Sequence, residues 1–280
     1  MKPLQLRSDH WLAPWEGVTH QASPNTGGAF AEGQPDTLVI HYTGGRSAES
    51  SARWLCDPRA KASAHVIIGR DGSVIQLVDF QTVAWHAGRS SWAGRSGLNR
   101  YSLGIELDNA GPLEARAAGY YTWFGRLVPE DEVLQATHRH ATTPNYWHTY
   151  TEAQLARCEE LCELLINTYR LHTLVGHEEI SPGRKTDPGP AFPLEALRQR
   201  LLAGDRSEEA PALSMETPTQ QGLVVADRLN IRQQPHLQSP TVTDALPRGT
   251  LVSIEAEQGG WAKVRVETEG WVKKEYLKTS

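Results

Sequence analysis

The chain has 280 residues, of which 39% are hydrophobic and 22% are charged, and this composition is typical of a soluble globular protein. Its length allows one large domain and one small one. The net charge of 28 − 33 = −5 gives no support for a nucleic-acid partner, which would favour a basic face. No stretch approaches the roughly 20 apolar residues that a membrane span needs, and three cysteines do not form a disulfide framework.

Strand signals recur through the first two hundred residues. Short apolar, β-branched runs predict strands at 37–43 (TLVIHYT) and 102–107 (SLGIEL). Between them, HVIIGRDGSVIQLV at 65–78 predicts a hairpin that turns at Asp71-Gly72.

Helical patterns cover 47–56, 151–171 and 193–202, and Thr151 with Gln154 has the spacing of a capping box at the start of the second. Mixed with the strands, these helices predict an α/β fold in which a central mixed β-sheet is flanked by helices.

Two of the cysteines, Cys158 and Cys162, lie four residues apart in the predicted second helix. This spacing places them on one helix face, where cysteine commonly acts as a small core residue. A metal site would need partners nearby, and the sequence shows none, so we interpret the pair as helix core.

The segment 111–150 has a different character. We interpret it as a long irregular insertion, and such loops inside compact domains are often functional. A surface excursion held by its own aromatic side chains is an equally good interpretation, and we do not expect the histidines of this segment to be metal ligands. The aromatic and histidine residues are Tyr120, Tyr121, Trp123, Phe124, His138, His140, Tyr146, Trp147 and His148.

A change of composition divides the chain. Residues 205–221 (DRSEEAPALSMETPTQQ) are acidic and rich in Ser, Thr and Pro, which predicts a linker between a first domain at 1–204 and a second at 222–280. The second domain has only strand and turn signals, and apolar and charged residues alternate along GGWAKVRVET. We expect a small all-β barrel there.

Three residues of the first domain have the chemistry of a zinc site. His41 lies near the end of a predicted strand, and His177 and Asp187 lie in VGHEEISPGRKTDPGPAF, a stretch whose Pro and Gly predict irregular backbone. A catalytic Zn²⁺ takes three protein ligands of the imidazole and carboxylate type and keeps one position open. With eleven histidines in the chain, spacing alone leaves the alternative of hydrogen-bonded structural histidines open.

Five motifs in order resemble one enzyme family. They are VIHYTGG, SAHVIIGRDGSVIQLV, AWHAG, LNRYSLGIELDNAG and VGHEEISPGRKTDPGPAF, spread over about 36–202. Together they resemble the zinc-dependent N-acetylmuramoyl-L-alanine amidases, the group that also includes the peptidoglycan recognition proteins.

The resemblance implies roles for five residues: His41, His177 and Asp187 match the Zn²⁺ ligands, Glu106 matches the catalytic carboxylate, and Lys185 matches a lysine near the scissile carbonyl. Glu106 would accept a proton from water and return it to the leaving amine. Lys185 would stabilise the developing oxyanion.

Five further residues are candidates for substrate contact: His65, Arg70, Trp85, His86 and Asn99. His65 and His86 belong to the family motifs SAH and WHAG and could line the groove or orient a ligand from behind. Structural packing explains each of the five equally well.

The tail resembles a bacterial SH3 domain through LNIRQQP, GTLVSI, GGWAKVRV and GWVKKEYL. Such modules often bind cell-wall peptide or glycan. If this one does, Trp261, Trp271 and Tyr276 are the expected contacts, although filling a small core is at least as good an explanation for them.

The resemblance therefore implies a peptidoglycan hydrolase that acts on muropeptides and carries a wall-targeting module. Two alternatives stay open: a recognition protein that binds peptidoglycan without cutting it, and a toxin or lysin delivered to another cell's wall. The first seventeen residues show no apolar run of signal-peptide length. We therefore expect synthesis in the cytoplasm, followed by non-classical export or delivery to the wall. The sequence leaves the oligomeric state undetermined.

Overall fold

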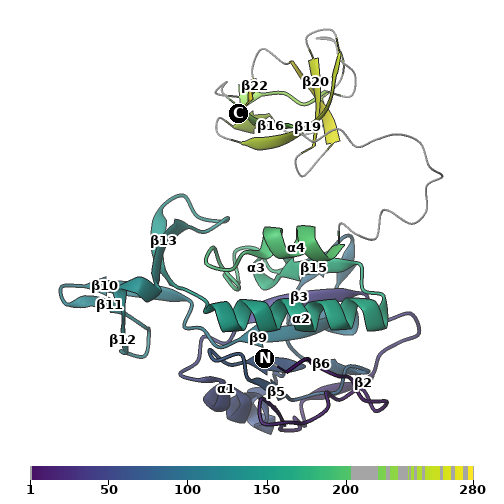
Figure 1. The fold of residues 1–280 in the computed structure, drawn as a ribbon, viewed down its shortest axis with the longest axis vertical. Coiled ribbons are helices and arrows are strands. Elements are labelled where there is room, and N and C mark those ends of the chain that lie inside the picture. Colours follow the sequence, from purple (N-terminus) through teal and green to yellow (C-terminus); the bar gives the residue numbers. More distant parts are fainter. Residues whose placement is uncertain are drawn as a thin grey trace. The chain divides into compact units, whose positions relative to one another are not determined.

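The computed structural model describes residues 2–202 and, further along, 220–224, 228–232, 239, 241–242, 245–247, 250–258, 261–265, 269–273 and 277–279. The chain divides into two compact units, Met1–Glu209 and Ala210–Ser280 (Figure 1). Each unit has its own hydrophobic core. Most of the predicted linker, 205–219, lies outside the described residues. Its last two positions belong to the first strand of the second unit.

A six-stranded mixed sheet forms the centre of the first unit, in the order β1-β5-β4-β9-β3-β15. Strand β9 runs parallel to both β3 and β4, β15 runs parallel to β3, and β5 runs antiparallel to β4. The predicted mixed sheet is confirmed. Its strands are β1 (Val18–His20), β3 (Thr37–Tyr42), β4 (Val66–Ile68), β5 (Val74–Gln76), β9 (Ser102–Leu107) and β15 (Thr173–Gly176).

The three predicted helices are confirmed as α1 (Ala48–Leu55), α2 (Glu152–Tyr169) and α4 (Leu194–Leu202). Thr151 and Gln154 form the expected capping box of α2. The predicted hairpin is formed by β4 and β5. A further one-turn helix, α3 (His177–Ile180), follows β15 directly. Cys158 and Cys162 are fully buried in α2, as expected for core residues.

Short elements complete the first unit. The strand pairs are β2 (Thr26–Ala29) with β6 (Thr82–Ala84), and β7 (Ser91–Trp92) with β8 (Arg95–Ser96). The 3-10 turns are η1 (Pro58–Ala60), η2 (Leu98–Arg100) and η3 (Glu130–Glu132).

Side chains alternate between the two faces of the central sheet. Leu38 and Ile40 pack in the same buried cluster as the apolar side of α2, which lies along the sheet in Figure 1, whereas Val39 packs in a separate cluster with α3. By this alternation His41 lies on the face opposite α2. Glu106 lies on the same face, because its neighbours along β9 belong to the α2 cluster. The sheet thus places both side chains on one side.

The prediction of an irregular segment at 111–150 is wrong. The segment forms a five-stranded antiparallel sheet in the order β12-β11-β10-β14-β13. Its strands have two to five residues, too few for a clear alternating pattern, and aromatic contacts such as that between Tyr120 and Tyr146 help to hold them. The strands are β10 (Pro112–Arg116), β11 (Gly119–Tyr121), β12 (Leu127–Val128), β13 (Val133–Thr137) and β14 (Pro144–His148).

The described part of the second unit contains strands and no helix, as predicted. Five strands form a sheet in the order β21-β20-β19-β16-β22, and β17 pairs with β18. They are β16 (Gln220–Val224), β17 (Arg228–Leu229), β18 (Leu246–Pro247), β19 (Leu251–Gln258), β20 (Trp261–Arg265), β21 (Glu269–Lys273) and β22 (Leu277–Thr279).

The predicted alternation holds along β20, where Ala262 and Val264 are buried and Lys263 is half-buried. Trp261 is also buried, which favours a core role for it. The Trp271 side chain and Tyr276 lie outside the described parts of the structure. Across the described residues of both units, no helix combines the length and apolar character of a membrane-spanning segment.

Candidate metal centre and active site

His41, His177 and Asp187 bring three ligand atoms to one point. Nδ1 of His41 lies 2.9 Å from Nδ1 of His177 and 2.9 Å from Oδ2 of Asp187. The Nδ1 of His177 lies 2.9 Å from the same Oδ2. All three side chains are buried. Within the described residues, this is the one group of His, Cys, Asp and Glu side chains whose ligand atoms lie close enough to share a metal ion.

A chain of hydrogen bonds fixes which nitrogen of His41 carries its proton. The Ser102 carbonyl oxygen, 3.2 Å from Nε2 of His86, can only accept, so this Nε2 carries the hydrogen. Burial holds the pKa of His86 well below its usual value, so its Nδ1 is a bare acceptor. This Nδ1 lies 3.0 Å from Nε2 of His41, which must donate. Nδ1 of His41 is therefore left with a free lone pair facing the centre.

The same reasoning applies to His177. In the neutral form of its ring, Nε2 donates to the Ala87 carbonyl oxygen at 3.1 Å, which leaves Nδ1 as the lone-pair nitrogen. Burial and the neighbouring His177 lower the pKa of His41 to about 4. Burial raises the pKa of Asp187, but the two neighbouring histidines outweigh burial and hold this pKa below its usual value. With both rings neutral, the centre is a set of two imidazoles and one carboxylate.

This donor set fits a divalent metal. Three lone pairs at 2.9 Å from one another repel unless a cation lies among them, because no hydrogen remains to bridge them. Two imidazole nitrogens and one carboxylate oxygen are ligands that Zn²⁺ accepts, and three protein ligands leave a coordination position for substrate or water.

Local backbone brings the ligands together from distant parts of the sequence. His41 is the fifth residue of β3, and the adjacent parallel strand β15 runs directly into α3, whose first residue is His177. The Asp187 carbonyl accepts a 2.8 Å hydrogen bond from the Glu178 amide, which ties the two parts of the loop. Gly176 allows this approach, since a Cβ there would lie 2.7 Å from Pro188. In the stretch predicted to be irregular, the first residues thus form the one-turn helix α3, and irregular backbone begins after it.

Glu106 lies beside the centre on the neighbouring strand, paired in register with His41. Its Oε2 is shut away from solvent and has no hydrogen-bond partner among the described residues. Burial and the negative charge of Asp187 raise the pKa of Glu106 to about 8, and the charge of Lys185 opposes this rise. Such a perturbed, unpartnered carboxyl in a hollow is typical of an active site.

Lys185 lies on the loop that also carries Asp187 and is half-buried. Its positive charge lowers the pKa of both His41 and Glu106, so the ammonium acts on both sides of the centre. The structure thus brings all five metal and catalytic candidates into one site, while their individual roles stay predictions.

The structure gives His65 and Arg70 framework contacts. Nδ1 of His65 accepts from the Gly104 amide at 3.0 Å and Nε2 lies 3.0 Å from the Thr82 carbonyl oxygen, so both ring nitrogens serve the backbone. Arg70 pairs with Glu132 at 2.9 Å and holds the base of the insertion. Substrate contact by His65 or Arg70 stays a prediction.

Asn99, in η2, holds the turn that carries Trp85 and His86. The Asn99 Oδ1 accepts hydrogen bonds from the amides of His86 and Ala87 at 3.1 and 2.7 Å, which fixes the turn behind His41. His86 orients His41 as described above, the role expected of a residue behind a metal ligand. Trp85 is half-buried, and its amide donates to Ser63 Oγ at 2.8 Å. Substrate contact by any of the three also stays a prediction.

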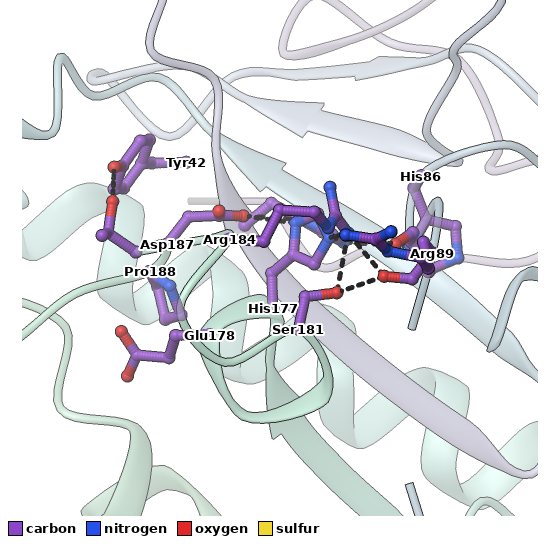
Figure 2. Close-up of polar contacts among 12 residues, drawn as sticks. Tyr42, His86, Arg89, His177, Glu178, Ser181, Arg184, Asp187 and Pro188 are labelled. Carbon is purple, nitrogen blue, oxygen red and sulfur yellow. Dashed lines mark hydrogen bonds and ion pairs between the residues drawn. The ribbon is translucent and has the colours of Figure 1, made fainter. Parts of the chain in front are cut away.

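Sequence reasoning missed Arg184. Figure 2 shows its guanidinium beside His177, with hydrogen bonds that cross to the neighbouring loop. It donates to the carbonyl oxygens of Ala87 and Arg89 at 3.0 and 2.8 Å and to Ser181 Oγ at 2.7 Å. These bonds fasten the loop that carries Asp187 to the turn that carries His86. In the sequence Arg184 is one more basic loop residue next to Lys185, and nothing marks its partners.

The three histidines of the insertion lie outside the centre, in agreement with the prediction. His138 Nε2 lies 2.6 Å from Glu178 Oε2, and His148 Nε2 lies 3.0 Å from Glu132 Oε2. The first pair connects the insertion to α3, and the second lies within the insertion.

Two hollows border the site. One of about 520 Å³ includes Glu106, and the other, of about 630 Å³, includes Arg184 together with Arg89 and Arg100. In the strand order β9-β3-β15, Glu106 lies on one side of His41, and His177 follows the strand on the other side.

The fold and this centre define a metallohydrolase type of site, and comparison with known proteins identifies the family. Residues 31–190 match the family model described as N-acetylmuramoyl-L-alanine amidase, and residues 227–278 match the model of a bacterial SH3 domain. The chain therefore belongs to the N-acetylmuramoyl-L-alanine amidase family and carries a C-terminal bacterial SH3 domain.

Several relatives are similar over most of the first unit. The 1,6-anhydro-N-acetylmuramyl-L-alanine amidase AmpD of Enterobacter cloacae is 31% identical over 222 residues, 72% of this chain and 98% of AmpD. The N-acetylmuramoyl-L-alanine amidase AmiD of Escherichia coli is 31% identical over 172 residues, 58% of this chain and 52% of AmiD. A crystal structure of a selenomethionine AmpD derivative aligns with a TM-score of 0.49 at 27% identity, over 71% of this chain and 99% of that one.

Proposed function

We propose that this protein is a Zn²⁺-dependent hydrolase of the amide bond between the lactyl group of N-acetylmuramic acid and L-alanine. The observation that carries the proposal is the convergence of the His41, His177 and Asp187 ligand atoms beside the unpartnered carboxyl of Glu106. Family membership and the names of the AmpD and AmiD relatives support the same bond.

Zn²⁺ bound by the three ligands would supply Lewis-acid chemistry at the scissile carbonyl. Glu106 takes a proton from the attacking water at its carboxylate and gives it to the amine nitrogen as the C–N bond breaks. In the metal-free protein the pKa of Glu106 is raised to about 8, and the charge of bound Zn²⁺ would lower it toward neutral pH, where the group can both hold and release a proton. The charge of Lys185, already in place, stabilises the oxygen that becomes negative.

The hollow beside Arg184 suits the peptide side of the substrate. Its three arginines, Arg89, Arg100 and Arg184, favour carboxylates, and a stem peptide carries carboxylates while a neutral sugar does not. The peptide leaving group would therefore lie on the α3 side of the centre, and the muramoyl group would lie toward Glu106.

We further propose that the enzyme acts on intact wall and that the second unit directs it there. A bacterial SH3 domain next to an amidase domain supports this, since soluble fragments need no anchor. We propose delivery to the wall by non-classical export or as a toxin or lysin.

Mass spectrometry of the products from purified sacculi tests the proposal. Free stem peptides that begin with L-alanine are expected, lost when a chelator removes the metal and restored by Zn²⁺. Soluble muropeptides with reducing and with 1,6-anhydro sugar ends serve as parallel substrates, because AmpD is named for the anhydro form. Binding to sacculi with no hydrolysis of any of these substrates would instead support a recognition protein.

A further inference from the structure

The hollow beside Glu106 has two tryptophan side chains that the proposed reaction does not use. Trp54, on α1, is 57% exposed, and Trp123, in the turn between β11 and β12 of the insertion, is 70% exposed. Both line the hollow, although they are 69 positions apart in the chain. Its lining is completed by Thr43, Gly44, Gly45, Arg46, Ser50, Ser51, Leu55 and Glu106.

Trp123 is fixed in place while its ring stays open to solvent. Its Nε1–H donates to the Gly44 carbonyl oxygen at 2.7 Å, and the adjacent Phe124 ring lies under the Arg46 guanidinium at 5.1 Å. These contacts pin the insertion to the loop after β3. Since the N–H is satisfied, the exposed part of Trp123 is apolar ring surface, which is costly to leave in water.

Two polar atoms of the same hollow have no partner among the described residues. The Oγ of Ser51 is buried and makes no hydrogen bond, and the same holds for Oε2 of Glu106. Unsatisfied buried oxygen atoms are costly, and both of these lie in side chains that line a cavity large enough for a ligand. The hollow therefore combines apolar ring surface with two lining side chains whose polar atoms are unpaired among the described residues.

A pyranose ring has this chemistry, since its C–H faces are apolar and its rim carries hydroxyl and acetamido groups. We propose that this hollow is the subsite for the N-acetylated sugar of the substrate, with Trp123 of the insertion as its specificity-determining wall. The inference deepens the proposed function and rests on it, because the lactyl ether joins the sugar to the bond beside Glu106. It also gives the insertion a role, which the sequence left open.

The stem peptide fits this hollow less well. Arg46 is its one lining cation, and the Phe124 ring already lies within cation–π distance of that cation, whereas the other hollow has three arginines. The peptide starts with alanine, which has no surface to match an indole. The sugar is the part of the substrate that must lie on the opposite side of the scissile bond from the peptide.

The test compares two substrates that share the lactyl–L-alanine amide. One is a soluble N-acetylmuramoyl peptide, and the other is the D-lactoyl peptide, which lacks the sugar ring. Trp123→Ala should lower kcat/KM about tenfold more on the muramoyl peptide than on the lactoyl peptide, and Trp123→Phe should restore most of the difference. Leu127→Ala is the matched control, since Leu127 is 53% exposed on the same small sheet and does not line the hollow.

Equal losses on both substrates, or none on either, would overturn the subsite. If the metal-loaded wild type cleaves neither substrate, the proposed function fails, and binding of N-acetylmuramic acid alone, followed by NMR, decides the subsite. If Trp123→Ala weakens the binding of the sugar, the subsite is supported. If the variant binds the sugar as well as the wild type does, the subsite proposal is overturned. If Trp123→Ala instead weakens the binding of the free stem peptide, the hollow accepts peptide, and the subsite proposal is also overturned.

Discussion

His41 and Glu106 occupy directly paired positions on the adjacent parallel strands β3 and β9. Their side chains lie on the same face of the sheet, so a candidate metal ligand and the proposed proton-transfer group are neighbours with no loop between them. Side chains held on strands of a central sheet move less than side chains on loops, and catalysis depends on such fixed placement. The other two ligands reach this pair from β15 and the loop after α3.

Glu106→Gln should abolish most turnover without removing the metal. The amide keeps the size of the carboxyl and cannot exchange a proton, so we expect kcat to fall about 10²- to 10⁴-fold. Product release from a soluble muropeptide and the Zn²⁺ content of the purified variant are the two measurements. Glu163→Gln, at an exposed position on α2, is the control. Near-normal turnover in a zinc-loaded Glu106→Gln variant would exclude the proton-transfer role.

The pH dependence of stability should report the buried state of Glu106. The folded pKa of about 8 lies above the ordinary 4.5, so between these values the folded metal-free protein keeps a proton that the unfolded chain has lost. Its free energy of unfolding therefore falls as the pH rises from about 4.5 to about 8, and the contribution is level above that.

Glu106→Gln removes this contribution. Relative to the wild type, the free energy of unfolding of the metal-free variant should therefore rise by about 1–3 kcal/mol between pH 4.5 and pH 9. A tenfold change in proton affinity corresponds to roughly 1.4 kcal/mol. Solvent that enters around the charged carboxylate reduces part of this free-energy cost. Denaturant unfolding of both chelated proteins from pH 4.5 to pH 9 measures the difference, in which other titrations largely cancel. A difference that stays constant over this range would contradict the raised pKa.

His86→Ala should weaken metal binding without removing a ligand. Without Nδ1 of His86 as acceptor, Nε2 of His41 loses the 3.0 Å contact that selects its tautomer. Loss of such a partner behind a ligand typically lowers metal affinity about 10- to 100-fold. Competition with a chromogenic Zn²⁺ chelator gives the affinity, and His172→Ala, at an exposed histidine, is the control. Affinity equal to that of the wild type would show that His41 needs no orienting partner.

Gly104 makes room for that partner. A Cβ at this position of β9 would lie 2.4 Å from Cγ of His86, too close for any real contact. Gly104→Ala should therefore cost about 1–3 kcal/mol in the free energy of unfolding and displace the His86 ring. In a His86→Ala background the same substitution should cost much less, so a double-mutant cycle by chemical denaturation isolates the clash. Additive costs would assign the destabilisation to another contact.

Sequence patterns were sufficient for the framework of the site. The strands that carry His41 and Glu106 have clear apolar runs, α2 has a capping box, and the ordered motifs predict the three residues whose ligand atoms converge. These features are local or belong to family motifs. The long-range connection from the Ser102 carbonyl through His86 to His41 follows from the fold and has no signature along the chain.

The insertion shows more clearly which features the sequence could not predict. Its strands are too short for periodicity, so its sheet was not predicted, and the approach of Trp123 to Gly44 depends on how that sheet folds back. The partners of Arg184 were missed for the same reason, because its three acceptors are a hydroxyl on its own loop and two carbonyl oxygens on a loop about 95 residues away. Backbone acceptors carry no residue-type signal that a sequence could reveal.

Removal of residues 210–280 should separate catalysis from wall binding. The first unit has its own core and all five metal and catalytic candidates, so the truncated protein should retain activity on soluble muropeptides within about twofold. On purified sacculi its activity should fall about tenfold or more at low enzyme concentration, because the gain from a tethered second binding unit is lost. Pull-down with sacculi and product release from both substrates provide the comparison. Equal loss on soluble and insoluble substrates would mean that the second unit supports the catalytic domain rather than directing it to the wall.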